Sequence, residues 1–366
     1  MTSSVSKLGA LATTLLFLSF ATSAQITINT IHLPQAGSTY TIQESTPEPL
    51  VDYSNTGAGV TWDFSGIESM NELEIDFGDI ESAPTLAQLV FNQPWMQPDH
   101  VCDIYGPGEL PDMSEFGSEL PIELSSFYNY YQTSGDSYNI AGFSMGAQGI
   151  DFPIPYTDID EIHPLPLSYG DNVNSTHAFL AEIPTMFSYA SEGSRVGVVD
   201  GWGTLLLPNG EEHEVLRLAT TINKSDEFTL EGMDPIPFEY ETTVYQWLGD
   251  GGLPYLEVQT AFDVPFRVRY QGEVEEDNTS GTEGITGVIQ EDIKMFPNPA
   301  NVGETITLQG VDANSTWEVR NGSGVLCKKG QGSLLDTENL SIGAYFLIQN
   351  TSKNGLLSRP KVLIIQ

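Results

Sequence analysis

The chain has 366 residues and a formal net charge of −37, and this charge is unevenly distributed. Residues 25–294 contain 45 acidic and 6 basic side chains, whereas the two ends of the chain are slightly basic. A field of this sign repels phosphate backbones and anionic lipid, which excludes nucleic-acid binding and peripheral membrane binding for the central block. Because 40% of all residues are hydrophobic and 10% are aromatic, the chain is expected to fold despite its charge.

A secretory signal peptide is predicted at residues 1–24. Met1–Lys7 is short and positive, Leu8–Ala21 is apolar, and small residues follow as far as Ala24. The apolar run is shorter than the roughly 20 residues that a membrane span needs, and no later stretch is apolar enough to cross a bilayer. We expect cleavage between Ala24 and Gln25, and a mature protein without a transmembrane segment.

The two cysteines, Cys102 and Cys327, lie far apart in the sequence and in different predicted domains. A secreted protein that is built around disulfides usually carries more cysteines than this. The sequence gives no reason to pair them, so stability is expected to come from a packed core.

The central body, residues 25–271, has the pattern of antiparallel β-structure. Short runs rich in β-branched and aromatic residues are separated by Gly, Pro, Asn and Asp. Many short strands with such turns predict an all-β fold with a β-sandwich-like body. Strands are expected at Ile26–Leu33, Val60–Phe64, Ser126–Gln132, Tyr138–Met145, Val215–Ile222, Glu239–Leu248, Pro254–Phe262 and Val264–Tyr270.

Three local patterns refine this prediction. Arg267 and Arg269 alternate with apolar residues, which predicts a strand with one buried face and one wet face. Pro208–Gly210 and Asp250–Gly252 have the composition of hairpin turns. A short helix is expected only near Thr85–Phe91.

A polar stretch at residues 272–291 contains few large apolar side chains and is predicted to be a flexible linker. The acidic excess ends after it, and residues 292–366 are expected to form a separate, small C-terminal β-sandwich. Its strands are predicted near Thr305–Leu308, Ser315–Arg320, Gly324–Lys329, Ala344–Gln349 and Lys361–Ile365.

Three ordered blocks characterise this C-terminal segment. Lys294–Ala300 contains Pro-Asn-Pro-Ala, Leu340–Phe346 has the form Leu-x-x-Gly-x-Tyr, and Lys361–Ile365 is a basic-apolar strand at the end of the chain. With these blocks the segment resembles the type A sorting domain of the type IX secretion system of Bacteroidetes. The residues that carry the resemblance are Pro297, Asn298, Pro299, Gly343, Tyr345 and Lys361.

The resemblance implies that the C-terminal segment is an export address that the type IX machinery reads at the outer membrane. It further implies that the protein is released outside the cell or attached to surface lipopolysaccharide. The central body is similar to uncharacterised secreted β proteins of the same phylum, for example at Gly57–Ser65 and Gly201–Gly210. That similarity brings no known activity with it.

One string in the body looks catalytic: Gly142–Gly146 matches Gly-x-Ser-x-Gly around Ser144. In an α/β-hydrolase this serine lies on a turn that leads from a strand into a helix. Gly149, Pro153 and Pro155 disfavour a helix at this point, and three downstream histidines offer no selected base. We therefore predict no catalytic residue.

Carboxylate clusters at residues 76–81, 158–161 and 211–214 raise the question of bound calcium, which prefers oxygen ligands. No complete calcium loop is present, because Thr176 stands where the loop that starts at Asp171 needs glycine. Acidic residues are so frequent here that such clusters arise by chance. No metal site and no cofactor are predicted, and a structural calcium ion remains the open alternative.

Trp62, Trp95, Trp202 and Trp247 could form a platform for sugar rings, although tryptophans in β-runs usually belong to the core. We interpret the body as a binding, adhesion or structural module for a glycan or protein ligand rather than as an enzyme. A secreted hydrolase of polysaccharide or ester substrates is the alternative. A deep cleft that gathers carboxylates over an aromatic floor would favour the enzyme.

Overall fold

The computed structural model describes most of the chain from Gln25 to Ile365. The predicted signal peptide, Ala24 of the cleavage site and the predicted linker from residue 273 onward lie outside the described residues. The described ranges are 25–45, 52–108, 124–147, 149–183, 187–208, 210–230, 235–272, 293–311, 313–321, 325–349 and 361–365. Below, the body means residues 25–272 and the C-terminal unit means residues 293–365, in each case the described ones.

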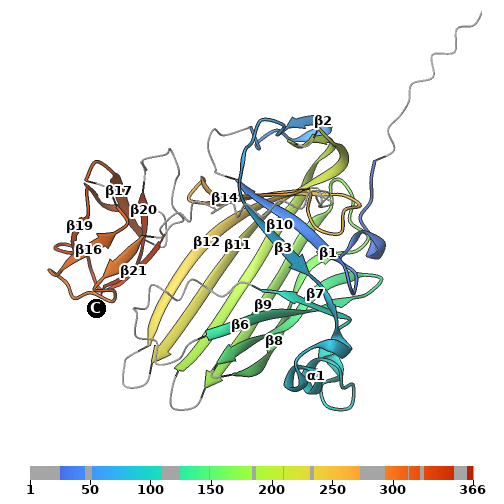
Figure 1. The fold of residues 1–366 in the computed structure, drawn as a ribbon, viewed down its shortest axis with the longest axis horizontal. Coiled ribbons are helices and arrows are strands. Elements are labelled where there is room, and N and C mark those ends of the chain that lie inside the picture. The colour runs from blue at the N-terminus through green and yellow to red at the C-terminus, as the bar shows by residue number, and fades with distance from the viewer. Residues whose placement is uncertain are drawn as a thin grey trace, which may run out of the picture.

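A sheet of 14 strands makes up the body. Figure 1 shows its long, strongly curved strands. Strand pairs are antiparallel except for β2, which runs parallel to β10. The neighbouring strands follow the order β3-β1-β14-β13-β12-β11-β10-β9-β8-β7-β6-β5-β4. Their bounds are β1 (Thr39–Ser45), β2 (Gly57–Asp63), β3 (Ser69–Asp76), β4 (Gly78–Asp79), β5 (Ile104–Pro107), β6 (Leu124–Thr133), β7 (Ser137–Ala147), β8 (Ile150–Pro164), β9 (Asn172–Ile183), β10 (Phe187–Leu206), β11 (Glu212–Leu230), β12 (Ile236–Leu248), β13 (Leu256–Ala261) and β14 (Val264–Gln271).

The sheet curls round until its two ends meet. β3 and β4 stand at opposite ends of the strand order, yet only Phe77 separates them in the sequence. Because one residue spans less than about 4 Å, the two end strands must be close together in space. The all-β prediction is confirmed, and the body is a single, nearly closed, barrel-like sheet where two stacked sheets were expected.

One apolar cluster lies inside the curl. Its members come from β5, β6, β7, β9, β10, β11 and β12 and from Phe77, so side chains from strands around the sheet meet in it. The face of each strand that carries them is therefore the inner face of the sheet. The buried members are Ile28, Leu33, Phe77, Ile104, Tyr131, Tyr138, Leu165, Leu167, Val173, Val199, Leu216, Leu218 and Leu248.

Two further clusters cover parts of the outer face. Trp62 on β2 is 1% exposed, and its ring meets that of Trp247 edge to face with a centroid distance of 6.0 Å. Phe91, the last residue of α1 (Thr85–Phe91), stacks on Tyr130 of β6 with centroids 4.2 Å apart. The helix and the β2 segment thus bury aromatic rings that would otherwise face solvent.

Most predicted elements of the body are present. β2, β6, β7, β11, β12, β13 and β14 overlap the predicted strands, and α1 spans the predicted helix Thr85–Phe91. The prediction for Ile26–Leu33 is wrong, since this segment makes one β-bridge at Ile28 and then a 3-10 turn. The side chain of Asn29 accepts the N–H of Ile31 and thereby favours the turn.

Two small antiparallel sheets form the C-terminal unit, in the strand orders β15-β16-β19 and β18-β17-β20-β21. Side chains of both sheets, such as Leu308 and Leu347, meet in one apolar cluster. The five strands predicted here are confirmed as β16, β17, β18, β20 and β21. The bounds are β15 (Lys294–Phe296), β16 (Thr305–Gln309), β17 (Thr316–Asn321), β18 (Leu326–Gln331), β19 (Leu334–Asp336), β20 (Gly343–Gln349) and β21 (Lys361–Ile365).

Candidate functional site: the charged inner face

The inner face of the curled sheet carries most of the positive charge of the body, although residues 25–272 contain only five basic side chains. Side chains alternate along a strand, so residues an even number of positions from Val199 on β10 face inward with it. This places Arg195 inside. The same alternation from Leu218 on β11 places Lys224 inside, and that from Val173 on β9 places His177 inside.

Cross-strand pairing extends this inner row over further strands. Gln246 of β12 lies opposite inward-facing Leu218, Glu257 of β13 opposite Gln246, and Arg269 of β14 opposite Glu257. Arg269 in turn lies opposite Glu44 of β1. Directly paired residues share a face, so all of these side chains project inside the curl.

Asp160 and Arg195 form the tightest ion pair of the inner face. The guanidinium donates from Nε and Nη2 to the two carboxylate oxygens of Asp160, at 2.7 Å each. Nδ1 of His177 lies 3.8 Å from the same carboxylate, outside hydrogen-bond distance. The Asp160 side chain is 4% exposed and that of Arg195 is 17% exposed, so the acid is enclosed while the base reaches solvent.

Asp226 is held by hydroxyl groups. Tyr189 and Tyr240 donate to its Oδ2 at 2.8 and 3.2 Å, and Ser191 donates to its Oδ1 at 2.5 Å. The residue is 1% exposed. Lys224 faces inward two positions before it on β11, and within the described part of the chain its amine makes no hydrogen bond or ion pair. Lys224 is therefore a half-buried cation beside a carboxylate that other groups already satisfy.

The inward-facing charged residues of β1, β13 and β14 also have hydrogen-bond partners. Arg269 donates from Nε to Oε1 of Glu44 at 2.9 Å, and its Nη2 lies 2.8 Å from the same oxygen. Gln246 and Gln259 donate to the two oxygens of Glu257, at 2.8 and 2.7 Å. The inner face thus holds hydrogen-bonded charges of both signs.

Burial and charge shift the pKa values of these groups in different directions. Burial raises the pKa of Asp160, but the Arg195 guanidinium outweighs it, and the pKa stays below its ordinary value. Burial lowers the pKa of His177, and the opposing charge of Asp160 does not restore it. Burial also lowers the pKa of Lys224, with Asp226 acting in the opposite direction. Near neutral pH, Asp160 is thus ionised and His177 is neutral.

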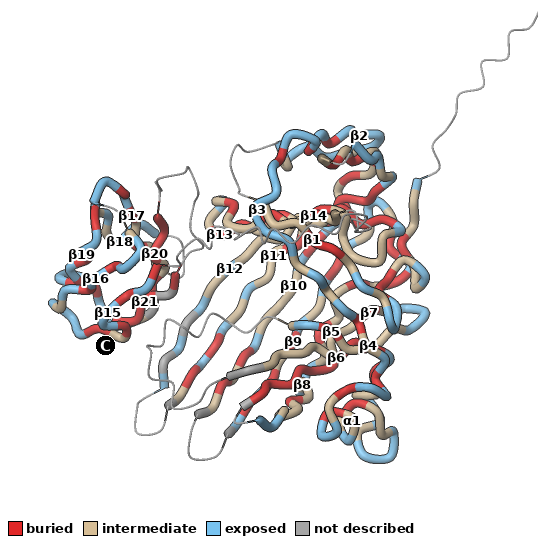
Figure 2. Tube along the Cα trace, viewed as in Figure 1, coloured by how far each residue is buried: buried red, intermediate tan, exposed pale blue. Residues whose placement is uncertain are grey.

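Part of this face remains accessible. Arg195, Lys224, Tyr240 and Gln259 are half-buried, whereas the apolar cluster on the same face is closed. In Figure 2, buried, half-buried and exposed positions follow one another along β10 and β11. These half-buried residues carry amine, guanidinium and phenol groups, which can bind a carboxylate and donate to hydroxyl oxygens.

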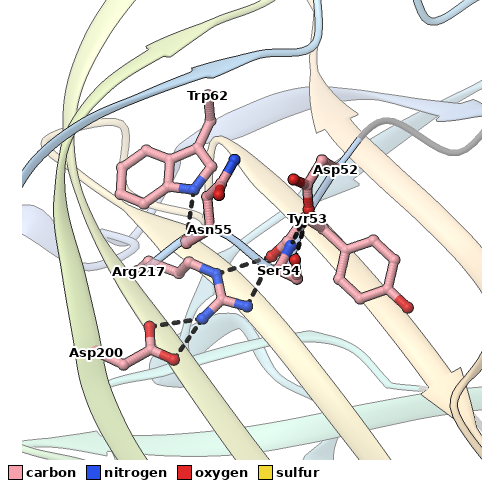
Figure 3. Close-up of polar contacts among 7 residues, drawn as sticks. All are labelled: Asp52, Tyr53, Ser54, Asn55, Trp62, Asp200 and Arg217. Atoms are coloured by element: carbon pink, nitrogen blue, oxygen red, sulfur yellow. Dashed lines mark hydrogen bonds and ion pairs between the residues drawn. The ribbon is translucent and has the colours of Figure 1, made fainter. Parts of the chain in front are cut away.

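The fifth basic residue of the body, Arg217, lies on the other face of β11 and has a different role (Figure 3). Its Nη1 donates to Asp200 Oδ1 at 2.6 Å, and its Nε and Nη2 donate to the carbonyl of Tyr53 at 3.1 and 2.7 Å. The guanidinium carbon lies 4.8 Å from the ring centre of Tyr245. Arg217 therefore clamps the segment before β2 onto the sheet.

The structure places Ser144 inside strand β7, 0% exposed and hydrogen-bonded to the hydroxyl of Tyr130 at 2.9 Å. β8 begins at Ile150, so a strand follows the Gly-x-Ser-x-Gly string where a hydrolase has a helix. This serine is not presented on a nucleophile turn.

The four tryptophans do not form one platform. Trp62 and Trp247 are core residues, while Trp202 packs against the inner cluster and Trp95 is 75% exposed. The two cysteines are free thiols, buried at Cys102 and exposed at Cys327.

The predicted carboxylate clusters are divided among separate partners. Asp76 accepts from Thr39, and Asp158 accepts from Thr176, while Asp160 pairs with Arg195. Within the ranges that the structure describes, no group of three His, Cys, Asp or Glu residues is placed to hold a metal ion.

Four of the residues that carry the sorting-domain resemblance, Pro297, Asn298, Pro299 and Lys361, belong to the first and last blocks of the C-terminal unit. Asn298 is 5% exposed, and its Oδ1 accepts the N–H of Ile364 at 2.9 Å. Pro297 and Pro299 flank it, both after cis peptide bonds. Lys361 opens β21 and is 1% exposed.

The middle block, Leu340–Phe346, supplies one turn residue and one core residue. Gly343 has a φ of +149°, a conformation that residues with a Cβ rarely adopt. Tyr345 is 7% exposed and donates its hydroxyl to the carbonyl of Ser341 at 2.9 Å.

Sequence reasoning did not identify the inner charged face. A usable signal was the scarcity of bases, because Arg195, Lys224, Arg267 and Arg269 stand alone among the acids of the body. In so acidic a body, a basic residue within a strand is a candidate for an ion pair or for a ligand contact. The partners themselves, such as Glu44 for Arg269, lie too far away in the sequence to be predicted.

Comparisons with known proteins give little. No protein-family model and no curated protein matches the chain. Among solved structures, the chain is similar to PorZ, an essential bacterial surface component of the type IX secretion system of Porphyromonas gingivalis, at 8% identity and a TM-score of 0.18. The similarity covers 69% of this chain, which spans about half (53%) of PorZ, and it is too low to carry over a fold or a function. No helix among the described residues is long and apolar enough to span a membrane.

Proposed function

We propose that the protein is exported by the type IX secretion system, that its C-terminal unit is the export address, and that its body binds a ligand outside the cell. The protein would have two partners in turn. The secretion machinery binds it during export, and surface lipopolysaccharide holds it after sorting if it is not released. The proposal for the address rests on the sequence blocks. The hydrogen bond from the N–H of Ile364 to Asn298 is consistent with it, because it joins the first and last of these blocks in one folded unit.

Deletion of residues 292–366 tests the address. The shortened protein should remain inside the producing cell, while the full chain should appear in the medium or on the cell surface. Immunoblots of the cell, surface and medium fractions measure this, and secretion of the shortened protein in normal amounts would overturn the proposal.

For the body, we propose that the inner face binds a small molecule that has one carboxylate and several hydroxyl groups, which is the chemistry of a sugar acid. The observation that carries this proposal is the half-buried Lys224, whose amine is unpaired among the described residues while the acids around it have other partners. A lysine amine attracts a carboxylate, and the phenols and amides nearby can bond to hydroxyl groups.

The acidic exterior limits the ligand to few negative charges. At physiological ionic strength exposed charges interact over roughly 8 Å. A ligand with one carboxylate can therefore approach the acidic surface at a small cost, whereas a polyanion is repelled at many positions at once. This restriction favours a single sugar acid over an acidic polysaccharide.

Thermal unfolding of the full chain with monomeric sugar acids, and with their neutral amides as controls, tests the ligand class. We expect the acid to raise the Tm and the amide to have little effect, because bound ligand stabilises only the folded state. Lys224→Met should abolish the shift, whereas Lys294→Met, at an exposed lysine of the C-terminal unit, should retain it. Equal shifts in both variants would contradict the proposal.

A further inference from the structure

The C-terminal unit contacts the body through an aromatic side chain that its own core does not use. Tyr345 and Leu347 of β20 point into the apolar cluster of the unit, so Phe346 between them points away from it. The Phe346 ring lies 5.4 Å from that of Phe262 and 6.3 Å from that of Tyr240, measured between centroids. Both contacts are edge to face, which is a favourable geometry for aromatic pairs.

The body side of this contact has an unusual backbone. Phe262 and Asp263 form the turn between β13 and β14, and their φ angles are +53° and +61°. A hairpin turn with two positive φ angles strongly favours Asn-Gly, and a phenylalanine there is strained. Such a strained residue is retained where a favourable contact of its side chain offsets the backbone strain. Here the turn holds the Phe262 ring against Phe346.

The same region of the body contains an open strand edge. β13 pairs with β12 only from Thr243 to Trp247, while β12 pairs with β11 along its whole length. The first part of β12, from Ile236 to Thr242, thus has no second neighbour among the described strands of the body. β20 of the C-terminal unit lies against β12. Figure 1 shows the unit on the side of the sheet where β12 stands. Open edges are prone to pair with other chains, and a covering element prevents this.

We infer that the C-terminal unit is a docked cover of the body, held by Phe346 between Phe262 and Tyr240, so that it stays attached even when the linker is cut. The occupant of this surface on the body is the chain's own β20. This inference goes beyond the proposed export and ligand binding and does not depend on either. Tyr240 also donates to Asp226 on the inner face, so this residue belongs both to the docking contact and to the inner face.

The test uses the full chain with a protease recognition sequence inserted between residues 273 and 292. After complete cutting, the two fragments should elute together in size-exclusion chromatography at micromolar concentration. Phe346→Ala should make them elute separately. Ile342→Ala, which removes a 77% exposed apolar side chain from the same unit, should leave them together.

A second variant separates loss of docking from loss of folding. Phe262→Asn removes the ring but suits the turn better, so the body should unfold at the same denaturant concentration or a higher one. The cut fragments of this variant should nevertheless elute separately. Separate elution of the unsubstituted fragments, or joint elution of the Phe346→Ala and Phe262→Asn fragments, would overturn the inference.

Discussion

Arg217 shows how one buried cation can fix a long segment of chain. Its guanidinium joins Asp200, the carbonyl of Tyr53 and two aromatic rings, and its side chain is 2% exposed. All three guanidinium nitrogens therefore donate hydrogen bonds, and a substitution would leave Asp200 and the carbonyl of Tyr53 without this donor. The segment before β2 is bound to the sheet by these contacts, so this position controls more than its own packing.

We expect Arg217→Met to destabilise the body by about 3 kcal/mol, the lower end of the range for a broken buried pair, because Asp200 keeps 22% exposure and can be solvated. Equilibrium unfolding in urea measures this. The double variant Arg217→Met with Asp200→Asn should recover part of the loss, since it removes the unpaired charge. A cost below about 0.5 kcal/mol, typical of surface positions, would contradict a clamp.

His163 makes folding stability depend on pH. Burial lowers its pKa to about 4, and the neighbouring Arg195 charge acts in the same direction. The unfolded chain has an ordinary histidine with a pKa near 6.5, so between pH 6.5 and 4 the unfolded state binds the proton first. Stability from this group is complete above pH 6.5 and is lost as the pH falls to 4, by about 3 kcal/mol.

His163→Phe tests this, because phenylalanine can keep the stacking on Tyr138 without a titrating group. The loss of unfolding free energy between pH 6.5 and 4 should be smaller in this variant by about 3 kcal/mol. Urea titrations at several pH values give the two curves. Parallel curves for both proteins would exclude His163 as the source.

At the scale of elements, the parallel pairing of β2 with β10 depends on one glycine. Gly203 has a φ of +155°, and a Cβ at this position would lie 1.9 Å from the carbonyl oxygen of Val60. The two backbones are therefore too close for any side chain between them. β2 in turn carries Trp62, so its position decides whether the outer aromatic cluster can form.

Gly203→Ala should therefore destabilise the body by about 1–3 kcal/mol, the usual cost of overpacking, and should expose Trp62. Urea unfolding and tryptophan fluorescence measure the two effects. Gly66→Ala is the matched control, because a Cβ there meets nothing within 4 Å. Equal stability of the two variants would show that β2 can shift without cost.

The positions of the strands could be predicted from the sequence, but their arrangement could not. Runs such as Val264–Tyr270 have the alternation of a strand, and the structure contains β14 there. The wet face predicted for Arg267 and Arg269 is, however, the inside of a curled sheet. Alternation shows that a strand has two different faces but not which of them the sheet encloses. The candidate site was missed for the same reason.

At the scale of the molecule, the charges are separated by location. No basic side chain of the described body is exposed, since Arg217 is buried and the other four are half-buried. The positive charge is thus withdrawn from the outer surface, and most of the exposed acids have no nearby cation. Mutual repulsion of these acids destabilises the compact state and keeps separate molecules apart.

We therefore expect NaCl to stabilise the protein. Raising its concentration from 0.05 to 0.5 M shortens the screening length and weakens the repulsion, so the Tm of the full chain should rise by several degrees. CaCl2 at equal ionic strength is the control for a specific ion site, which would give an additional shift. An unchanged or lower Tm in NaCl would mean that surface repulsion does not limit stability.

The meeting of β3 and β4 at Phe77 also has a consequence for the time course of folding. Ile42 of β1 pairs with Gln271 of β14, so the ring of strands cannot close before nearly the whole body has been made. Contacts of such long sequence separation form slowly, because much chain entropy is lost before they contribute. When the chain emerges N-terminus first, from the ribosome or from a membrane channel, β1 therefore lacks its partner β14 until almost the whole body has emerged. The C-terminal unit follows shortly afterwards. Any cellular route that handles this protein unfolded has that interval in which to act.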